Sequence, residues 1–355
     1  MTFVFKVGSW QFSAHSFTPT RKRAPMVARL NILTKLGRAV GISAFSIACL
    51  AAFPASAAAA EVQLKAASFI PFNTAFGRPF KAFIDRVNET GKGVIQISAV
   101  GPEAIPGMEQ PNALRSGLVD MIANPPSMYK SAVPEAHVQD LSNMTQAEQR
   151  ASGGQAAMNE SLKKKLNAVS LTAYGNGVPF YLYLTQDKVK SIEDFKGLRI
   201  RSQPNYAPFL RALGASQTMV AIPETYTALE RGVVDGLGYP GWGIEDLGWD
   251  KMLKVRVEPG FYSVVVNIMM NNKKLEQLTP EQRKVIDDAV VWFEDYMVQY
   301  DKETTLKSFE AQKAAGIKAV NLGPEYLKLA RDAMWEDVLK NSPKEAQALQ
   351  PLFQK

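Results

Sequence analysis

Strand-like and helix-like segments alternate along the chain from residue 61 onward, and this alternation most constrains the fold. The strand-like segments 61–68, 93–100 and 119–123 are separated by helix-like segments at 75–88 and 110–116. Two parallel neighbouring strands need a crossover connection, which is usually a helix. The alternation therefore predicts βαβ units around a parallel sheet, which places the chain in the α/β class.

A second block of the chain repeats this alternation. Its segments are 166–174, 180–184 and 198–201, which are strand-like, and 206–213 and 223–231, which are helix-like and end at glycines. We therefore expect two α/β lobes. The first lobe is predicted over residues 61–178 and the second over residues 179–278, with strands that cross between them.

A long helix is predicted after the second lobe. Thr279 is a suitable N-cap, Pro280 fits the first helical position, and Gln282 completes a capping box. The helical pattern then continues to Ala315, where a glycine gives a stop signal. A helix of this length is unusual in a globular protein. We expect residues 279–355 to form this helix and further helices that pack on both lobes.

Residues 1–60 have the features of an export leader. They contain seven basic residues and no acidic one, an apolar run over 39–53, and small residues that match a signal-peptidase site. We expect cleavage after Ala57 or Ala60, with Met26 as an alternative start of translation. The mature protein is therefore predicted to lie in the periplasm.

Two other interpretations of the leader fit less well. A membrane anchor needs about 20 apolar residues, and the run of 15 residues is shorter. A lipoprotein attached through Cys49 usually has Leu where this chain has Ser46, and the apolar run continues past the cysteine. These features favour a signal peptide that is removed.

The leader contains the whole excess of positive charge. The chain has 41 Lys and Arg residues against 34 Asp and Glu residues, and removing the seven basic residues of the leader leaves 34 against 34. A basic chain often has a nucleic-acid partner, but the balanced mature chain predicts none. The leader also contains the only cysteine, Cys49, and the mature chain keeps a single histidine, His137. A disulfide, a Cys/His zinc site and a Cys–His nucleophile pair are thereby excluded, and no cofactor is expected.

Three motifs follow the first lobe. Residues 195–201 read FKGLRIR, residues 223–236 read PETYTALERGVVDG, and residues 278–282 read LTPEQ. The first resembles the lKGlkiR segment of TRAP-transporter substrate-binding proteins of the dicarboxylate-binding type. The second resembles that family's sEvYtALqqGvvDG segment, and the third is similar to the opening of its long helix. The resemblance extends over roughly residues 62–340.

The resemblance implies a two-lobed fold that is similar to the type II periplasmic binding proteins, with a long C-terminal helix spanning both lobes. It implies a receptor without a catalytic role that closes on a small organic acid. Such a receptor delivers its ligand to the integral membrane subunits of a TRAP transporter. A monomer is expected.

Arg201 is the predicted carboxylate ligand. The resemblance implies this role, because the second Arg of the family's kiR segment binds the ligand carboxylate. The chemistry agrees, since a guanidinium is always charged and offers parallel donors that fit the two oxygens of a carboxylate. Outside this motif, a surface position or an internal salt bridge would be the expectation. Arg199 lies two residues away, so its side chain faces the opposite side of a strand, where we expect it to be solvated.

This chain departs from the family pattern at two positions of the expected site. Tyr239 replaces an Asn that often bonds the ligand, and Pro179 stands where a second Arg is often found. Trp242 adds another ring nearby, and aromatic faces bury large apolar areas. We therefore expect a monocarboxylate with an apolar or aromatic body, with a dicarboxylate as the alternative. Core packing is the other role open to Tyr239 and Trp242.

Further candidates follow from the rule that ligands of open α/β folds bind at the carboxyl ends of strands. Ile222 is added because it matches a cleft position that is often aromatic in the family. The candidates from the strand rule are Phe69, Phe72, Asn73, Asn124, Ser127 and Tyr174.

Two other classes of function stay open. An exported hydrolase would need an activated nucleophile with a base, and the sequence contains no motif for one. A sensory receptor that presents its ligand to a signalling protein has the same site chemistry as a transport receptor. Neighbouring genes for membrane subunits would favour transport, and a neighbouring sensor kinase would favour sensing.

Overall fold

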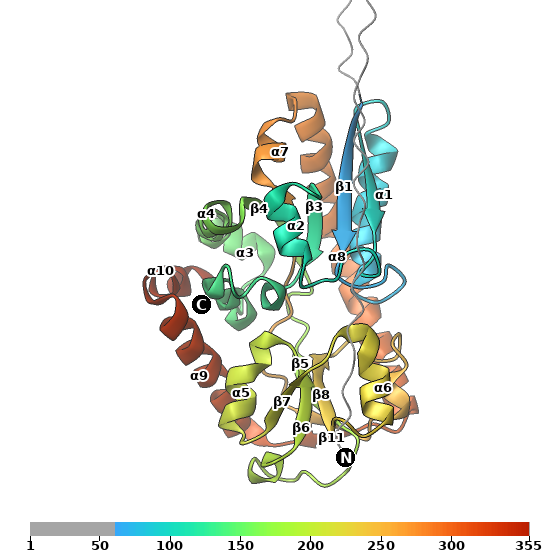
Figure 1. The fold of residues 1–355 in the computed structure, drawn as a ribbon, viewed down its shortest axis with the longest axis vertical. Coiled ribbons are helices and arrows are strands. Elements are labelled where there is room, and N and C mark those ends of the chain that lie inside the picture. Colours follow the sequence, from blue (N-terminus) through green and yellow to red (C-terminus); the bar gives the residue numbers. More distant parts are fainter. Residues whose placement is uncertain (1–60, 355) are drawn as a thin grey trace, which may run out of the picture. The chain divides into compact units, whose positions relative to one another are not determined.

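The computed structural model describes residues 61–354, drawn as a ribbon in Figure 1. The predicted leader, residues 1–60, lies outside the described residues, so its cleavage stays a prediction. The described part of the chain forms two separate β-sheets with helices around them, which confirms the α/β class.

The first sheet has five strands in the order β2-β1-β3-β10-β4. Its strands are β1 (Val62–Ser68), β2 (Ile95–Val100), β3 (Met121–Asn124), β4 (Ala168–Tyr174) and β10 (Val266–Asn271). β1 pairs in parallel with β2 and β3, because the helices α1 (Gly77–Thr90) and α2 (Gln110–Ser116) serve as crossovers. The parallel prediction is right for these three strands. β10 is antiparallel to both β3 and β4, which the alternation did not predict.

The second sheet has six strands in the order β11-β9-β5-β8-β6-β7. Its strands are β5 (Phe180–Leu184), β6 (Arg199–Ser202), β7 (Ser216–Met219), β8 (Gly236–Pro240), β9 (Val255–Glu258) and β11 (Lys318–Asn321). β6 pairs in parallel with β7 and β8. β5 is antiparallel to β8 and β9, so this sheet is mixed as well.

Besides the long helix α8 (Pro280–Ala314), which leads from β10 to β11, two segments of the chain connect the sheets. The chain leaves the first sheet after β4 and returns to it between β9 and β10. The two connections lie side by side and bond to each other: the Val264 amide donates to the Val178 carbonyl, and the Phe180 amide donates to the Tyr262 carbonyl, both at 2.9 Å. These two connections therefore form a hydrogen-bonded pair of segments, with an isolated antiparallel bridge between Pro179 and Ser263, rather than two free linkers.

The long helix is present as α8 (Pro280–Ala314) and ends one residue before the predicted end. Thr279 caps it, and Gln282 completes the capping box, as predicted. Its first part packs on α1 and β4 beside the first sheet. Its second part bonds the loop after β8, where Trp242 Nε1 donates to Thr305 Oγ1 at 2.8 Å and Gln312 Nε2 donates to the Gly241 carbonyl at 2.8 Å.

The remaining helices cover the sheets. They are α3 (Gln146–Ala151), α4 (Gly154–Leu166), α5 (Ala207–Ala212), α6 (Thr225–Glu230), α7 (Asn272–Glu276), α9 (Gly323–Asn341) and α10 (Pro343–Phe353). α9 packs on α5 beside the second sheet and on the 3₁₀ segment Pro134–Leu141, which follows β3. Like α8, it contacts elements that belong to both sheets.

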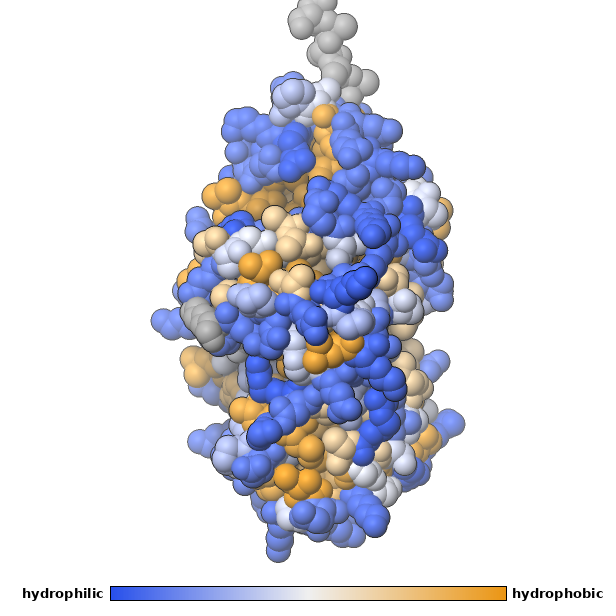
Figure 2. Space-filling model, turned by 90° about the vertical axis from the view of Figure 1, so that its left-hand side faces the viewer, coloured by the Kyte–Doolittle hydropathy of each residue, from blue (hydrophilic) through white to orange (hydrophobic). Residues whose placement is uncertain are grey.

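The face shown in Figure 2 carries mainly hydrophilic side chains, with apolar ones in several separate patches. Apolar side chains of the strands and helices pack instead into a core that includes Leu64, Phe80, Phe83, Ile200 and Phe209. Within residues 61–354, no helix is both long enough and apolar enough to cross a membrane.

Candidate ligand-binding cavity

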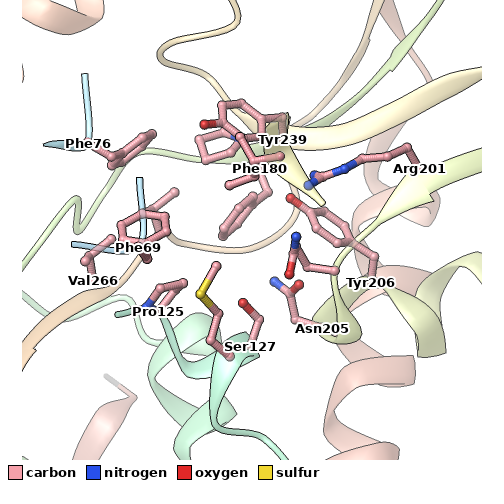
Figure 3. A pocket seen from close by; sticks show the side chains of 15 residues that line it. Phe69, Phe76, Pro125, Ser127, Phe180, Arg201, Asn205, Tyr206, Tyr239 and Val266 are labelled. Atoms are coloured by element: carbon pink, nitrogen blue, oxygen red, sulfur yellow. The ribbon is translucent and has the colours of Figure 1, made fainter. Parts of the chain in front are cut away.

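A cavity lies between the two sheets, and both sheets contribute to its wall (Figure 3). The enclosed space is small, because only about 50 Å³ of it is open to the centre of a water molecule. The first sheet contributes the loops after β1 and β3 and the start of β10. The second sheet contributes β5, β8 and the segment after β6. The carboxyl ends of β1, β3 and β6 therefore meet at one place.

Arg201 is the charged group of this wall. It lies next to the last residue of β6 with no exposed surface, and its Nε donates to the Val220 carbonyl at 3.0 Å. Its Nη2 has no hydrogen-bond partner, and none of the ion pairs formed within residues 61–354 includes it. Burial lowers the pKa of its guanidinium from the ordinary value, and the nearby hydroxyls of Tyr206 and Tyr239 raise it. A guanidinium nonetheless stays charged at neutral pH, so the wall holds a buried cation without a counter-ion.

Two tyrosines flank this cation. Figure 3 shows the hydroxyl of Tyr206 directed toward the guanidinium of Arg201. Burial raises the pKa of the Tyr206 and Tyr239 hydroxyls above the ordinary value, so neither supplies the missing negative charge. The Tyr239 ring packs edge-on against Trp249 at 4.9 Å between centroids, and the Arg201 guanidinium lies 5.8 Å from the Trp249 ring.

Gly238 makes room for the Tyr206 ring. A Cβ at position 238 would lie 2.5 Å from Cε1 and 2.7 Å from Cδ1 of Tyr206, which is closer than atoms can approach. The ring cannot yield easily, because Phe180 and Phe261 pack edge-on against it at 5.4 and 5.9 Å. The absence of a side chain at Gly238 is therefore required for the Tyr206 ring to take its place in the cavity wall.

The wall also contains two side-chain amides and a set of apolar groups. Gln203 and Asn205 follow β6, and Ser127 follows β3. Gln203 Oε1 and Asn205 Oδ1 are buried and have no partner among the described residues. The apolar part of the wall includes Phe69, Phe76, Met128, Phe180, Ile222 and Val266.

The structure brings four of the nine predicted ligand-binding residues into this wall: Arg201, Tyr239, Ile222 and Ser127. Phe69, which the strand rule also indicated, lies there too. Three others lie behind the wall. Trp242 is buried and stacks on Phe76 at 5.4 Å. The Tyr174 hydroxyl donates to the Phe76 carbonyl at 2.7 Å, and Asn124 donates to Gln110 at 2.8 Å. Trp242 and Tyr174 thus hold Phe76 in place.

Phe72 and Asn73 also lie outside the wall. Phe72 packs on Phe80 of α1 at 6.4 Å, and Asn73 is exposed while its carbonyl accepts a hydrogen bond from Arg78 at 2.5 Å. The loop after β1 turns so that Phe69 faces the cavity and the next residues lie against α1. The prediction that Phe72 and Asn73 contact a ligand therefore has no geometric support. Arg199 is exposed as predicted, but it is paired with Asp235 at 2.7 Å.

Sequence reasoning missed several residues of the wall, namely Phe76, Phe180, Gln203, Asn205 and Tyr206. The last three follow the predicted strand 198–201, so the rule that picked Ser127 would also have picked them. No comparable signal marks Phe76 or Phe180. Phe180 was assigned to a strand, and its position beside the cavity depends on the path of the connecting segments.

A hydrogen bond and an ion pair join the loop after β8 to the start of α1 beside the cavity. The loop after β8 contributes Asp246, whose Oδ2 accepts a hydrogen bond from the Ala75 amide at 2.6 Å. The same oxygen lies 3.3 Å from Nη2 of Arg78 in α1. Within residues 61–354, no cluster of His, Cys, Asp and Glu side chains could hold a metal ion.

Two sheets joined by paired connecting segments, with a cavity between them, are the arrangement of two-lobed solute-binding proteins. The family model for bacterial extracellular solute-binding proteins, family 7, matches residues 67–344, so the chain belongs to this family. Members of the family are periplasmic receptors that bind solutes, and the resemblance found in the sequence is confirmed.

Several relatives are similar to this chain over different lengths. The C4-dicarboxylate-binding periplasmic protein DctP of Rhodobacter capsulatus is 26% identical over 318 residues, which is 86% of this chain and 91% of that protein. The monocarboxylate 2-oxoacid-binding periplasmic protein all3028 of Nostoc is 23% identical over 275 residues, 74% of each chain. The uncharacterised protein YiiZ of Salmonella typhimurium is 25% identical over 170 residues, so this chain spans about half of it, 50%.

The fold is shared with solved structures. DctP7 of Bordetella pertussis, an extracytoplasmic solute receptor binding pyroglutamic acid, superposes with a TM-score of 0.73 at 18% identity. The match covers 82% of this chain and 99% of that one. The predicted two-lobed binding fold with a long C-terminal helix is thereby confirmed.

Proposed function

We propose that this protein binds a small monocarboxylate with an apolar or aromatic body in the cavity between its two sheets. It then delivers the ligand to the membrane subunits of a TRAP transporter. The observation that carries the proposal is the buried, unpaired guanidinium of Arg201 in a wall made largely of aromatic and aliphatic side chains.

An unpaired buried charge is costly, by several kcal/mol even after relaxation. A ligand carboxylate would remove this cost, because its two oxygens fit the parallel donors of a guanidinium. The attraction is strengthened where water is excluded. Three of the relatives support the carboxylate class, since they are named for C4-dicarboxylates, monocarboxylate 2-oxoacids and pyroglutamic acid.

The charge of the wall favours one carboxylate over two. Arg201 is the only Lys or Arg among the described residues that line this cavity. A second carboxylate would be buried against Phe69, Phe180 or Val266 without a cation, which is unfavourable. The aromatic side chains instead offer stacking surface for an apolar body.

Isothermal titration calorimetry of the purified exported protein tests the proposal. The ligands are isovalerate, phenylacetate and their hydroxylated forms on one side, and succinate and malate on the other. Arg201→Met should abolish binding of every acid. Arg199→Met is the matched control, because Arg199 lies on the same strand, exposed and paired with Asp235, and it should bind as the wild type does. Tight succinate or malate binding with none of the monocarboxylates would overturn the ligand class.

Delivery to the membrane is tested separately. Uptake of a ligand found by calorimetry should require this receptor together with the membrane subunits. The sensory alternative would be favoured by two results together. Uptake would be unchanged when the receptor is absent, and the ligand would change gene expression only when the receptor is present. The mass of the exported protein checks the predicted cleavage after Ala57 or Ala60.

A further inference from the structure

Two side-chain amide oxygens of the cavity wall lack hydrogen-bond partners among the described residues. They are Gln203 Oε1 and Asn205 Oδ1, and both are buried. Both residues line the cavity a few positions beyond Arg201. Figure 3 shows the Asn205 amide on the same side of the cavity as Arg201, pointing toward Ser127.

A carboxylate cannot satisfy these atoms. An ionised carboxylate only accepts hydrogen bonds, so it fits Nη2 of Arg201 but repels an amide oxygen. A ligand with a carboxylate and a pure hydrocarbon body would leave both amide oxygens buried and unpaired. Leaving a buried acceptor unpaired costs more than an average hydrogen bond contributes. A ligand that carries a hydrogen-bond donor would therefore satisfy these amide oxygens better than a pure hydrocarbon body.

The donor has to be uncharged. Within the described residues, no Asp or Glu lines this cavity, so an ammonium group would have no counter-ion and would be repelled by Arg201. A hydroxyl or an amide-type N–H meets the requirement. A hydroxyl also fits either orientation of a side-chain amide, because it both donates and accepts.

We propose that the ligand carries a neutral hydroxyl or N–H donor close to its carboxylate, and that Gln203 and Asn205 select for it. The substrate class is then hydroxy acids or cyclic amide acids with an apolar remainder, rather than amino acids or plain fatty acids. This inference rests on the proposed carboxylate-binding function, and it adds a second recognition element to the contact made by Arg201.

Matched ligands of one carbon skeleton test the proposal in calorimetry. Isovalerate has no donor, 2-hydroxyisovalerate and 3-hydroxyisovalerate have a neutral donor at two positions, and valine has an ammonium group. At least one hydroxy acid should bind wild-type protein about tenfold or more tightly than isovalerate, since one buried unpaired polar group is worth about that factor. Valine should bind more weakly than isovalerate and more weakly than the preferred hydroxy acid.

Two variants locate the selectivity. Gln203→Met and Asn205→Leu remove an amide while keeping a side chain of similar volume. Combined, they should reduce the preference for the hydroxy acid over isovalerate to within about twofold, because the amides that accept from the hydroxyl are gone. Thermal unfolding of each variant checks that it is folded, and the wild-type comparison needs no variant at all.

The outcomes separate this inference from the function beneath it. If isovalerate binds as tightly as both hydroxy acids and its binding needs Arg201, the donor requirement is wrong and the carboxylate receptor stands. If no acid binds, or binding survives Arg201→Met, the proposed function itself is wrong. A preference for the hydroxy acid that persists in the double variant would overturn the assignment to Gln203 and Asn205.

Discussion

The carboxylate of Asp246 accepts a hydrogen bond of 2.6 Å from the backbone amide of Ala75, and this contact joins the two sheets at the rim of the cavity. Ala75 lies just before α1, where backbone amides lack partners within the helix. Arg78 of α1 adds an ion pair to the same carboxylate oxygen. Moving the sheets apart would break both contacts, so they stabilise the observed arrangement of the two sheets, although neither Asp246 nor Arg78 lines the cavity.

Asp246→Ala should therefore weaken ligand binding although Asp246 does not line the cavity. A protein that spends less time closed binds with an apparent affinity reduced in proportion, and we expect a loss of about tenfold, since a hydrogen bond to a charged group contributes about 1.5 kcal/mol or more. Calorimetry measures the affinity, and solution scattering measures the population of the more open form. Asp187→Ala, which removes an exposed ion pair with Lys318, is the control. Unchanged affinity in Asp246→Ala would show that the contact does not favour closure.

Gly238→Ala should displace the ring of Tyr206. The added methyl group would overlap the ring, and overpacking of this kind costs about 1–3 kcal/mol. The free energy of unfolding, measured in urea, should fall by that amount, and ligand affinity should fall with it. Tyr206→Leu removes the ring, so the double variant should lose less stability than the sum of the two single changes. Strictly additive losses would contradict the proposed steric conflict.

Asp301 of α8 should make stability depend on pH. Burial raises its pKa to about 7, above the ordinary value of about 3.9. The folded protein thus holds a proton that the unfolded chain releases, so this group's contribution is most favourable below pH 4 and is lost as the pH rises toward 7.

The variant Asp301→Asn removes this dependence. Its unfolding free energy relative to wild type should be higher at pH 8 than at pH 4.5 by about 1–2 kcal/mol, a value reduced from the full shift because the side chain is partly exposed. Chemical denaturation at both pH values provides the measurement. Asp295→Asn, an exposed change on the same helix, controls for the loss of one charge. An equal effect of Asp301→Asn at both pH values would exclude the linkage.

Trp242 should prove to be a supporting residue. Trp242→Phe keeps a ring against Phe76 but removes the hydrogen bond to Thr305, so we expect a loss of about 1 kcal/mol in stability and a change in ligand affinity of less than about threefold. A large loss of affinity with unchanged stability would instead restore the predicted direct contact. Calorimetry and urea unfolding on the same preparation separate the two cases.

The elements that local patterns specify were predictable. α2 and β5 begin and end at the predicted residues, because each is bounded by glycines, prolines or a change of periodicity. α8 was found from its capping box. β10 was not predicted in the first sheet, because its partners β3 and β4 are far away in the sequence and no local pattern encodes that pairing.

The cavity was predictable where motif and chemistry agreed. Arg201 was found in this way, whereas Tyr206 and Asn205 depend on the 3₁₀ turn Pro204–Tyr206, which directs their side chains inward. Trp242 and Tyr174 were predicted to contact the ligand, whereas the structure places them against Phe76, because an aromatic residue near a site has the same sequence signal whether it faces the cavity or the residue behind its wall.

α8 packs beside the first sheet with its first part and bonds the loop of the second sheet with its second part. Because α8 is one continuous helix, the sheets cannot separate unless the helix bends or loses its contacts with one of the two sheets. A ligand that draws the sheets together would therefore have to bend this helix or break one set of its contacts. Two ligands that make the same contacts but draw the sheets together to different extents should then differ in affinity.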